Sequence, residues 1–237
     1  MIAAAYDPAL ELDVKLDDGA ALKPAAVVAH VRGPLRALLA MERVALNFLT
    51  HLCGIASLTA RYVEAVRGTQ AGIYDTRKTI PGLRRLAKYA VTCGGGHAHR
   101  VGLHDAVLVK DNHIAAVPLD RLTDFVADMV RRAAALQPPP AFVEVEVDTI
   151  EQLKRVLPAM AASPGSIVLL DNMKLDQLRT AVNVRNQAAP GVLLEASGGV
   201  GLDTVIGIAR TGVDRIAVGA LTHSAPALDL GLDVRTA

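Results

Sequence analysis

Aromatic residues are scarce in this chain. Its 237 residues include no Trp, three Phe and four Tyr, and its formal net charge is only +1. Proteins that bind single-stranded nucleic acid stack bases on aromatic rings, and binding to any nucleic acid relies on a broad basic surface. We therefore expect no nucleic-acid partner.

Cysteines are also few. Cys53 and Cys93 lie far apart, so they form neither a CxxC pair nor a disulfide framework, which is typical of a reducing cytoplasm. The first residues are acidic where a secretory signal is basic and then apolar. No uninterrupted apolar run is as long as a membrane-spanning helix. We expect a soluble, cytoplasmic protein with no membrane partner.

The chain does contain a large apolar fraction, 51% of its residues, and this follows an alternating pattern from residue 71 onward. Apolar strands are predicted at 71–76, 105–111, 141–147, 166–172, 192–197 and 215–220. Amphipathic helices are predicted at 81–93, 119–136, 149–162, 174–189 and 202–212. Alternating strands and helices predict an α/β fold of parallel strands, either a β/α barrel or an open doubly wound sheet. Six strands are fewer than the eight of a complete barrel, so a barrel would be short or open.

Before this pattern, short strands are predicted at 10–16 and 25–33, followed by a helix from Leu35 to about Val66. Gly54 marks a point where this helix could break.

Polar residues follow nearly every strand of the repeated pattern. They are Asp75 to Lys78, Lys110 to His113, Glu146, Asp171 and Asn172, Ser197 to Gly199, and Gly219 with Thr222 and His223. In barrels of parallel strands, the carboxyl ends of the strands and the loops after them form the active site. The pattern therefore predicts an enzyme.

Three kinds of side chain at this rim point to ligands. Arg77, Lys78, Arg100 and Lys110, with His99, suit carboxylates and phosphates, although each alone could be a solvated loop charge. Gly198, Gly199 and Gly219 suit a phosphate loop, or else two ordinary tight turns. Glu144, Glu146 and Asp148 share one strand face, which is therefore unlikely to face an apolar layer, and Asp171 ends the next strand. These acids suit sugar hydroxyls, Mg²⁺ or a developing oxocarbenium ion, whereas Asp148 and Asp171 could instead cap helices.

A metal hydrolase is a further interpretation. His97, His99 and His104 lie close in sequence, and Asp171 or His113 could complete a zinc site. The surrounding arginines and lysines would repel a cation, which weighs against it.

Long segments of the chain closely resemble the quinolinate phosphoribosyltransferases, also called carboxylating nicotinate-nucleotide pyrophosphorylases. The segments are 42–57, 75–114, 143–148, 169–173, 194–200 and 216–233, and the likeness covers essentially the whole chain. The resemblance implies a small N-terminal α/β sandwich domain, of which residues 1–67 are the remainder, including the long helix. It implies an open β/α barrel at 68–237, and it allows the last segment to return to the first domain. It also implies a homodimer or an assembly of dimers.

The resemblance further implies a pentosyltransferase of NAD biosynthesis. Such an enzyme transfers phosphoribosyl from phosphoribosyl pyrophosphate to quinolinate, with decarboxylation, and uses Mg²⁺. The residues that match the family's quinolinate binders are Thr76, Arg77, His99, Arg100, Lys110 and an Arg43 donated by the partner subunit. Those that match its phosphoribosyl pyrophosphate binders are Lys78, Glu146, Asp171, Ser197, Gly198, Gly199, Val218, Gly219, Ala220 and His223. Of these, Lys78, Glu146 and Asp171 match the catalytic groups, and the two acids match the Mg²⁺ site.

The chain departs from the family pattern at two places. It begins inside the N-terminal domain, without roughly the first forty to fifty residues usual there. Ala98 replaces a common asparagine. Two other functions stay open: a relative of the type that accompanies molybdate uptake and acts on another substrate, or a non-catalytic anion-binding protein. The full cationic set favours quinolinate, because a monocarboxylate would not need it.

Overall fold

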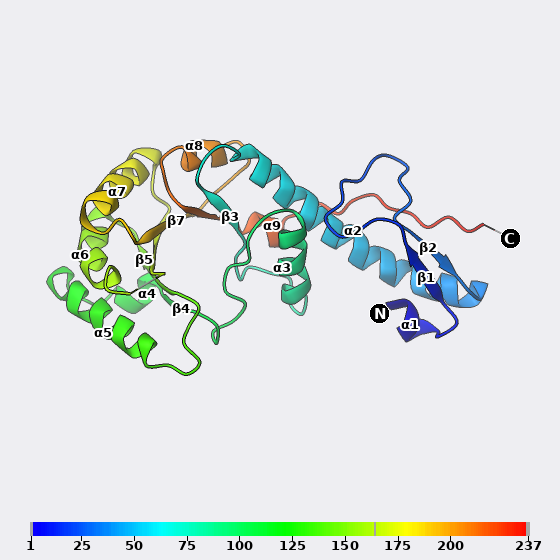
Figure 1. Cartoon of the computed structure of the whole chain (residues 1–237), viewed down its shortest axis with the longest axis horizontal. Coiled ribbons are helices and arrows are strands. Elements are labelled where there is room, and N and C mark those ends of the chain that lie inside the picture. The colour runs from blue at the N-terminus through cyan, green and yellow to red at the C-terminus, as the bar shows by residue number, and fades with distance from the viewer. Residues whose placement is uncertain (1, 164, 236–237) are drawn as a thin grey trace.

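A computed structural model describes residues 2–163 and 165–235, and most of these form an open barrel of six parallel strands (Figure 1). The strands are β3 (Gly72–Tyr74), β4 (Val107–Val109), β5 (Val143–Val147), β6 (Ile167–Asp171), β7 (Leu193–Ser197) and β8 (Arg215–Ala217). Their order is β3-β8-β7-β6-β5-β4. Within the described residues no ladder joins β3 to β4, so the barrel is open between its first two strands. The predicted short, open barrel is confirmed.

Helices follow the strands in the predicted alternation. They are α3 (Arg84–Cys93), α4 (Asp111–Ile114), η1 (Leu119–Arg121), α5 (Leu122–Ala134), α6 (Ile150–Met160), α7 (Leu175–Ala188), α8 (Val205–Ala209) and α9 (Ala220–His223). Thr149 caps α6: its hydroxyl accepts from the Gln152 N–H at 3.1 Å, and Gln152 Oε1 accepts from the Thr149 N–H at 3.2 Å. The N-cap of α7 is Lys174. The alternative that Asp148 and Asp171 serve as helix caps is therefore wrong.

Strand β5 is buried on both faces. Val143, Val145 and Val147 belong to the main apolar core. Glu144 and Glu146 alternate with them, at 0% and 5% exposure, and face the inside of the barrel. The barrel interior is thus partly ionic, as the acidic face of this strand predicts.

The N-terminal unit consists of α1 (Ile2–Tyr6), a two-stranded antiparallel sheet of β1 (Glu11–Val14) and β2 (Ala29–Arg32), and the start of α2 (Leu35–Ala65). Helix α2 runs without a break through Gly54, so the expectation of a break there is wrong. The glycine is needed for close packing instead, because a Cβ at this position would overlap the carbonyl oxygen of Pro226. The C-terminal segment lies beside α2, and the Leu228 N–H donates to the Thr50 carbonyl at 3.1 Å (Figure 1).

Helix α2 joins the two parts of the molecule. Ile55 and Tyr62, in its second half, are buried in the barrel's core cluster, whereas Leu35, Leu39 and Leu49, in its first half, are exposed. By length and composition it is also the one described helix able to cross a membrane, with a mean hydropathy of 1.3. A core helix passes the same test, and Ile55 and Tyr62 anchor the second half of α2 in the barrel's core.

Candidate active site

The loop after β3 meets the loop after β8 at the carboxyl-terminal rim of the barrel. The Thr222 hydroxyl donates to the Lys78 carbonyl at 2.8 Å, and the Lys78 N–H donates to Thr76 Oγ1 at 3.0 Å. A Cβ on Gly219 would lie 3.2 Å from both Lys78 Cδ and His223 Nε2. Lys78, Gly219 and His223 therefore gather at one place, where Gly219 leaves room between two basic side chains.

Arg77 and Arg100 form an uncompensated pair of cations. Arg100 is only 8% exposed; burial lowers its pKa, and the charge of Arg77 lowers that pKa further. Arg77 Nε is buried and without a hydrogen-bond partner. Across residues 2–163 and 165–235, no carboxylate pairs with Arg77, Arg100 or Lys78 within 4 Å. Arg100 is the buried member of this group, and a buried cation without an ion-pair partner is costly, so this part of the rim suits an anion.

His99 lies under these arginines and faces two buried acids. Its Nε2 is 3.0 Å from Glu144 Oε2 and 3.3 Å from Glu195 Oε1. Neither oxygen receives a well-directed hydrogen bond, so these contacts are ion pairs by distance. Burial alone would lower the pKa of His99, but Glu144 and Glu195 outweigh it and raise the pKa to about 9. At neutral pH this favours a further positive charge beneath the rim.

Arg215 completes the ionic interior of the barrel. Its Nε donates to Glu195 Oε2 at 2.6 Å, and its guanidinium lies 3.8 Å from the centre of the Tyr74 ring. Burial, and then the charge of Glu195, raise the pKa of Glu144. Two acids thus face two cations. Because these charges balance one another, little negative charge remains to bind a metal ion.

The histidine-rich segment forms no zinc site within the described residues. The one group whose potential metal-ligand atoms lie within 4.8 Å of one another is His99, Glu144 and Glu195, which includes neither His97 nor His104. His97 instead stacks on Tyr74, with ring centroids 4.9 Å apart. The metal-hydrolase interpretation therefore has no structural support.

A second set of acids lies at the ends of β4, β5 and β6. Lys110 Nζ pairs with Glu146 Oε2 at 2.7 Å, and Asp171 Oδ2 accepts from Asn172 Nδ2 at 2.5 Å. Burial, followed by the charges of Asp111 and Asp171, raises the pKa of Asp148, so these carboxylates act on one another. Carboxylate oxygens are the donors that Mg²⁺ prefers. Among the described residues these acids form no group of three within 4.8 Å of one another, so a magnesium ion here would take at most two of them and complete its shell with other oxygens.

The loop after β7 needs its two glycines. Gly198 and Gly199 have φ values of +98° and +58°, and a Cβ on Gly198 would overlap Asn172 Oδ1. A cavity of about 350 Å³ opens beside Gly199, lined also by Lys174 and Thr204. Backbone without side chains next to a cavity can approach a phosphate closely.

The structure places the predicted site residues at or just beneath this rim, except Arg43. Arg43 lies in the first half of α2, with 73% of its side chain exposed and only Glu42 nearby, at 3.6 Å. This half of the helix lies beside β1 and β2, away from the barrel (Figure 1).

Sequence reasoning missed several buried ionic residues around the site. Glu195 and Arg215 interrupt apolar strands, and a charge inside such a strand is a usable signal. Lys88 lies on α3 at 4% exposure, and nothing in the local pattern distinguishes it from a surface lysine.

Comparison with known proteins agrees with this geometry. Residues 1–53 match the model of the quinolinate phosphoribosyl transferase N-terminal domain, and residues 55–233 match that of the C-terminal domain. The carboxylating nicotinate-nucleotide pyrophosphorylase of Mycobacterium leprae is 50% identical over 93% of this chain and 74% of its own length. The human protein of that name is 41% identical over 92% of this chain and 70% of its own.

Solved structures give the same result. The nicotinate-nucleotide pyrophosphorylase of Francisella tularensis superposes with a TM-score of 0.85 at 35% identity, covering 96% of this chain and 76% of that one. NadC from Streptococcus pyogenes gives 0.82 at 39% identity, with the same coverage. The chain therefore belongs to the quinolinate phosphoribosyltransferase family.

Proposed function

We propose that this protein transfers the phosphoribosyl group of phosphoribosyl pyrophosphate to quinolinate, with loss of CO₂, in NAD biosynthesis. The observation that carries the proposal is the unpaired cationic group of Arg77, Arg100 and Lys78. A doubly anionic ring beside a phosphorylated sugar would supply the charge that this group lacks. The names of the relatives support the same reaction.

Quinolinate binding falls to the basic residues at the β3 and β4 side of the rim. Arg77 and Arg100 hold the two carboxylates, with Thr76 and His99 alongside. Lys110 can exchange its partner Glu146 for a substrate carboxylate, because its side chain is 48% exposed. Fixed charges of this kind orient the pyridine nitrogen toward C1 of the sugar donor, and such positioning lowers the barrier without a covalent intermediate.

The donor binds at the adjoining part of the rim, where the loop after β3 meets the segment after β8. Its 5′-phosphate binds the backbone of the two loops that follow β7 and β8, formed by Ser197, Gly198, Gly199, Val218, Gly219 and Ala220, with His223 nearby. Lys78 draws charge onto the departing pyrophosphate. Glu146 and Asp171 stabilise the positive sugar centre. They would also hold Mg²⁺, which supplies neutralising charge to the pyrophosphate when bound.

The reaction breaks the C1–pyrophosphate bond and forms a C1–N1 bond. The pyridine nitrogen is then positively charged. When the C2 carboxylate leaves as CO₂, its electron pair remains on C2 beside that charge, and a proton then takes its place. The products are nicotinate mononucleotide, pyrophosphate and CO₂.

A second copy of the chain is part of the proposal. Arg43 is exposed and distant from its own rim, so it can serve only a neighbouring molecule's site. The exposed leucines on the same half of α2, Leu35, Leu39 and Leu49, support a homodimer or a dimer-based assembly. The free thiols of Cys53 and Cys93 support a cytoplasmic setting.

The direct test is to supply quinolinate, phosphoribosyl pyrophosphate and Mg²⁺, and to measure CO₂ and nicotinate mononucleotide. We expect both products in equal amounts, loss of turnover with a chelator, and recovery with added Mg²⁺. Turnover of a different carboxylate alone would favour a relative with another substrate. Binding of both substrates without turnover would favour a non-catalytic anion-binding protein.

A further inference from the structure

Lys88 is a buried cation at a position where the fold has no need of one. It lies on the inner face of α3 beside the buried Ala87 and Val91, with only 4% of its surface exposed. Taking a lysine out of water is costly unless it is paired, and an apolar residue in its place is often as stable. Burial lowers the pKa of Lys88 and raises that of its partner Asp75, and the hydrogen bond and charge attraction between the two oppose both shifts.

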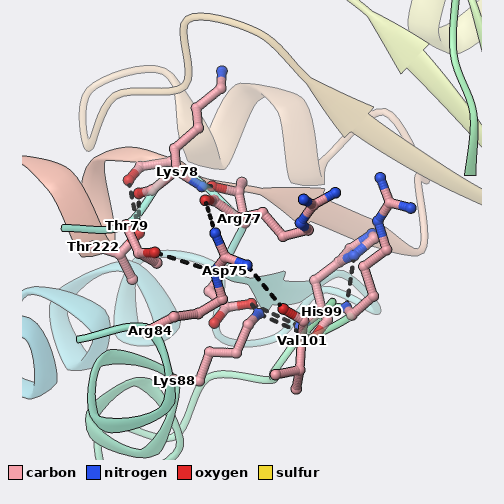
Figure 2. A network of polar contacts seen from close by, with 12 residues as sticks. Asp75, Arg77, Lys78, Thr79, Arg84, Lys88, His99, Val101 and Thr222 are labelled. Carbon is pink, nitrogen blue, oxygen red and sulfur yellow. Dashed lines mark hydrogen bonds and ion pairs between the residues drawn. The ribbon is translucent and has the colours of Figure 1, made fainter. Parts of the chain in front are cut away.

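The contacts of Lys88 all converge on one residue of the site. Its Nζ lies 2.5 Å from Asp75 Oδ1 and donates to the His99 carbonyl at 3.0 Å. The same Asp75 oxygen accepts from the His99 N–H at 2.7 Å. Both backbone groups of His99 are therefore bound by a single ion pair, as Figure 2 shows.

The pair connects the two segments that carry the arginines. Asp75 directly follows β3, two residues before Arg77, and His99 directly precedes Arg100. The two arginines repel each other, so the segments need a fastening that opposes their separation. Backbone bonds also join the two segments: the His97 N–H donates to the Ile73 carbonyl at 2.8 Å, and the Asp75 N–H donates to the His97 carbonyl at 3.1 Å. Arg84 adds a link farther out, through bonds to the Arg77 and Val101 carbonyls at 3.3 and 3.2 Å. Lys88 is the link that acts on His99 itself.

We propose that Lys88 and Asp75 are positioning residues: their buried ion pair holds the His99 backbone against the end of β3 and so sets His99 and Arg100 opposite Arg77 to receive the substrate's carboxylates. The proposal rests on the proposed function for its substrate. It concerns quinolinate more than the sugar donor, because Lys88 bonds only to Asp75 and to His99. Lys78 is held separately, through Thr222 and Thr76.

The test must separate positioning from simple stability. Lys88→Met alone would leave Asp75 charged, buried and unpaired, so that variant can lose its fold. The double variant Asp75→Asn with Lys88→Met leaves no charge at these two buried positions: the asparagine oxygen still accepts from the His99 N–H, and methionine fills the space of the lysine stem. A pair that served stability alone would be replaceable in this way.

We expect the double variant to fold with an unchanged or higher melting temperature. Losing the charge-assisted bond to the His99 carbonyl should raise the KM for quinolinate about tenfold or more, while the KM for phosphoribosyl pyrophosphate stays within about twofold. Lys88→Arg, which keeps the charge, should recover part of the quinolinate affinity. Lys154→Met, at an exposed position on α6, is the matched control and should behave as the wild type.

A readout without substrate keeps this proposal separate from the proposed function. Hydrogen–deuterium exchange of segment 97–101 should become faster in the double variant, while β5 and β6 keep their protection. Wild-type protein that fails to convert quinolinate would overturn the proposed function, but the exchange result would still test the fastening. Unchanged exchange at 97–101, or equal changes in both KM values, would overturn the positioning role.

Discussion

Arg77→Ala probes the cationic site most directly. Arg77 has no carboxylate partner among the described residues, so its loss breaks no ion pair of the free protein. Truncating one partner of a desolvated charge pair with a ligand costs about 2–5 kcal/mol. Removing Arg77 also relieves its repulsion of Arg100, which places the expected cost in the lower part of that range. A loss of about 2–3 kcal/mol corresponds to a kcat/KM for quinolinate roughly 30- to 150-fold lower.

The assay follows CO₂ release at varied quinolinate and saturating phosphoribosyl pyrophosphate. The melting temperature should stay about equal or rise, because Arg77 is half-buried, its Nε has no hydrogen-bond partner, and its charge repels Arg100. Arg210→Ala is the matched control, since Arg210 is exposed on the far end of α8. If Arg77→Ala kept kcat/KM within threefold of the Arg210→Ala value, the assignment of Arg77 to the substrate's carboxylates would be wrong.

Three further predictions follow from the same geometry. Gly198→Ala should lower the free energy of unfolding by about 1–3 kcal/mol, because the new Cβ combines a strained φ with overlap on Asn172. Gly199→Ala is the comparison: a Cβ there meets no atom within 4 Å, so this variant should lose less stability in the same denaturant titration. The pKa of His99 in the folded protein, about 9, lies above its ordinary value of 6.5. Protonated His99 therefore contributes its full stabilisation below pH 6.5, and this contribution is lost as the pH rises toward 9. Urea unfolding should show the free energy of unfolding fall across this range, and the fall should be smaller in His99→Gln. Arg43→Ala and Arg77→Ala proteins should each be nearly inactive but recover part of the activity when mixed and allowed to exchange subunits; no recovery would argue against an Arg43 shared between copies.

The alternating pattern predicted the barrel well because its cause is local. Each strand of three to five residues is apolar and bounded by turn residues, and all six appear where predicted. The break near Gly54 was the clear error. Glycine weakens a helix, but here the approach of Pro226, far away in sequence, explains why it is present. The alternative that Asp148 and Asp171 cap helices is also wrong, because Thr149 and Lys174 take the N-cap positions.

The roles given to individual site residues stay predictions, but the structure does show where these residues lie. Strand ends predicted that Arg77, Lys110, Glu146 and Asp171 would share one rim, because parallel strands direct their carboxyl ends to the same side. The state of each side chain was not predictable. Lys110 pairs with Glu146, whereas Arg77 has no acidic partner, and that difference depends on distances between segments remote in the chain.

The sequence by itself determined the alternation of strands and helices, the rim that carries the polar residues, and the family likeness. All three depend on residue type and on the order of residues over short segments. Only the tertiary structure decided which charges face one another. It placed Glu144, Glu195 and Arg215 around His99 inside the barrel, and it buried Lys88 against Asp75. Charges act through space over a few ångströms, so their partners depend on how distant segments pack and cannot be read from neighbours along the chain.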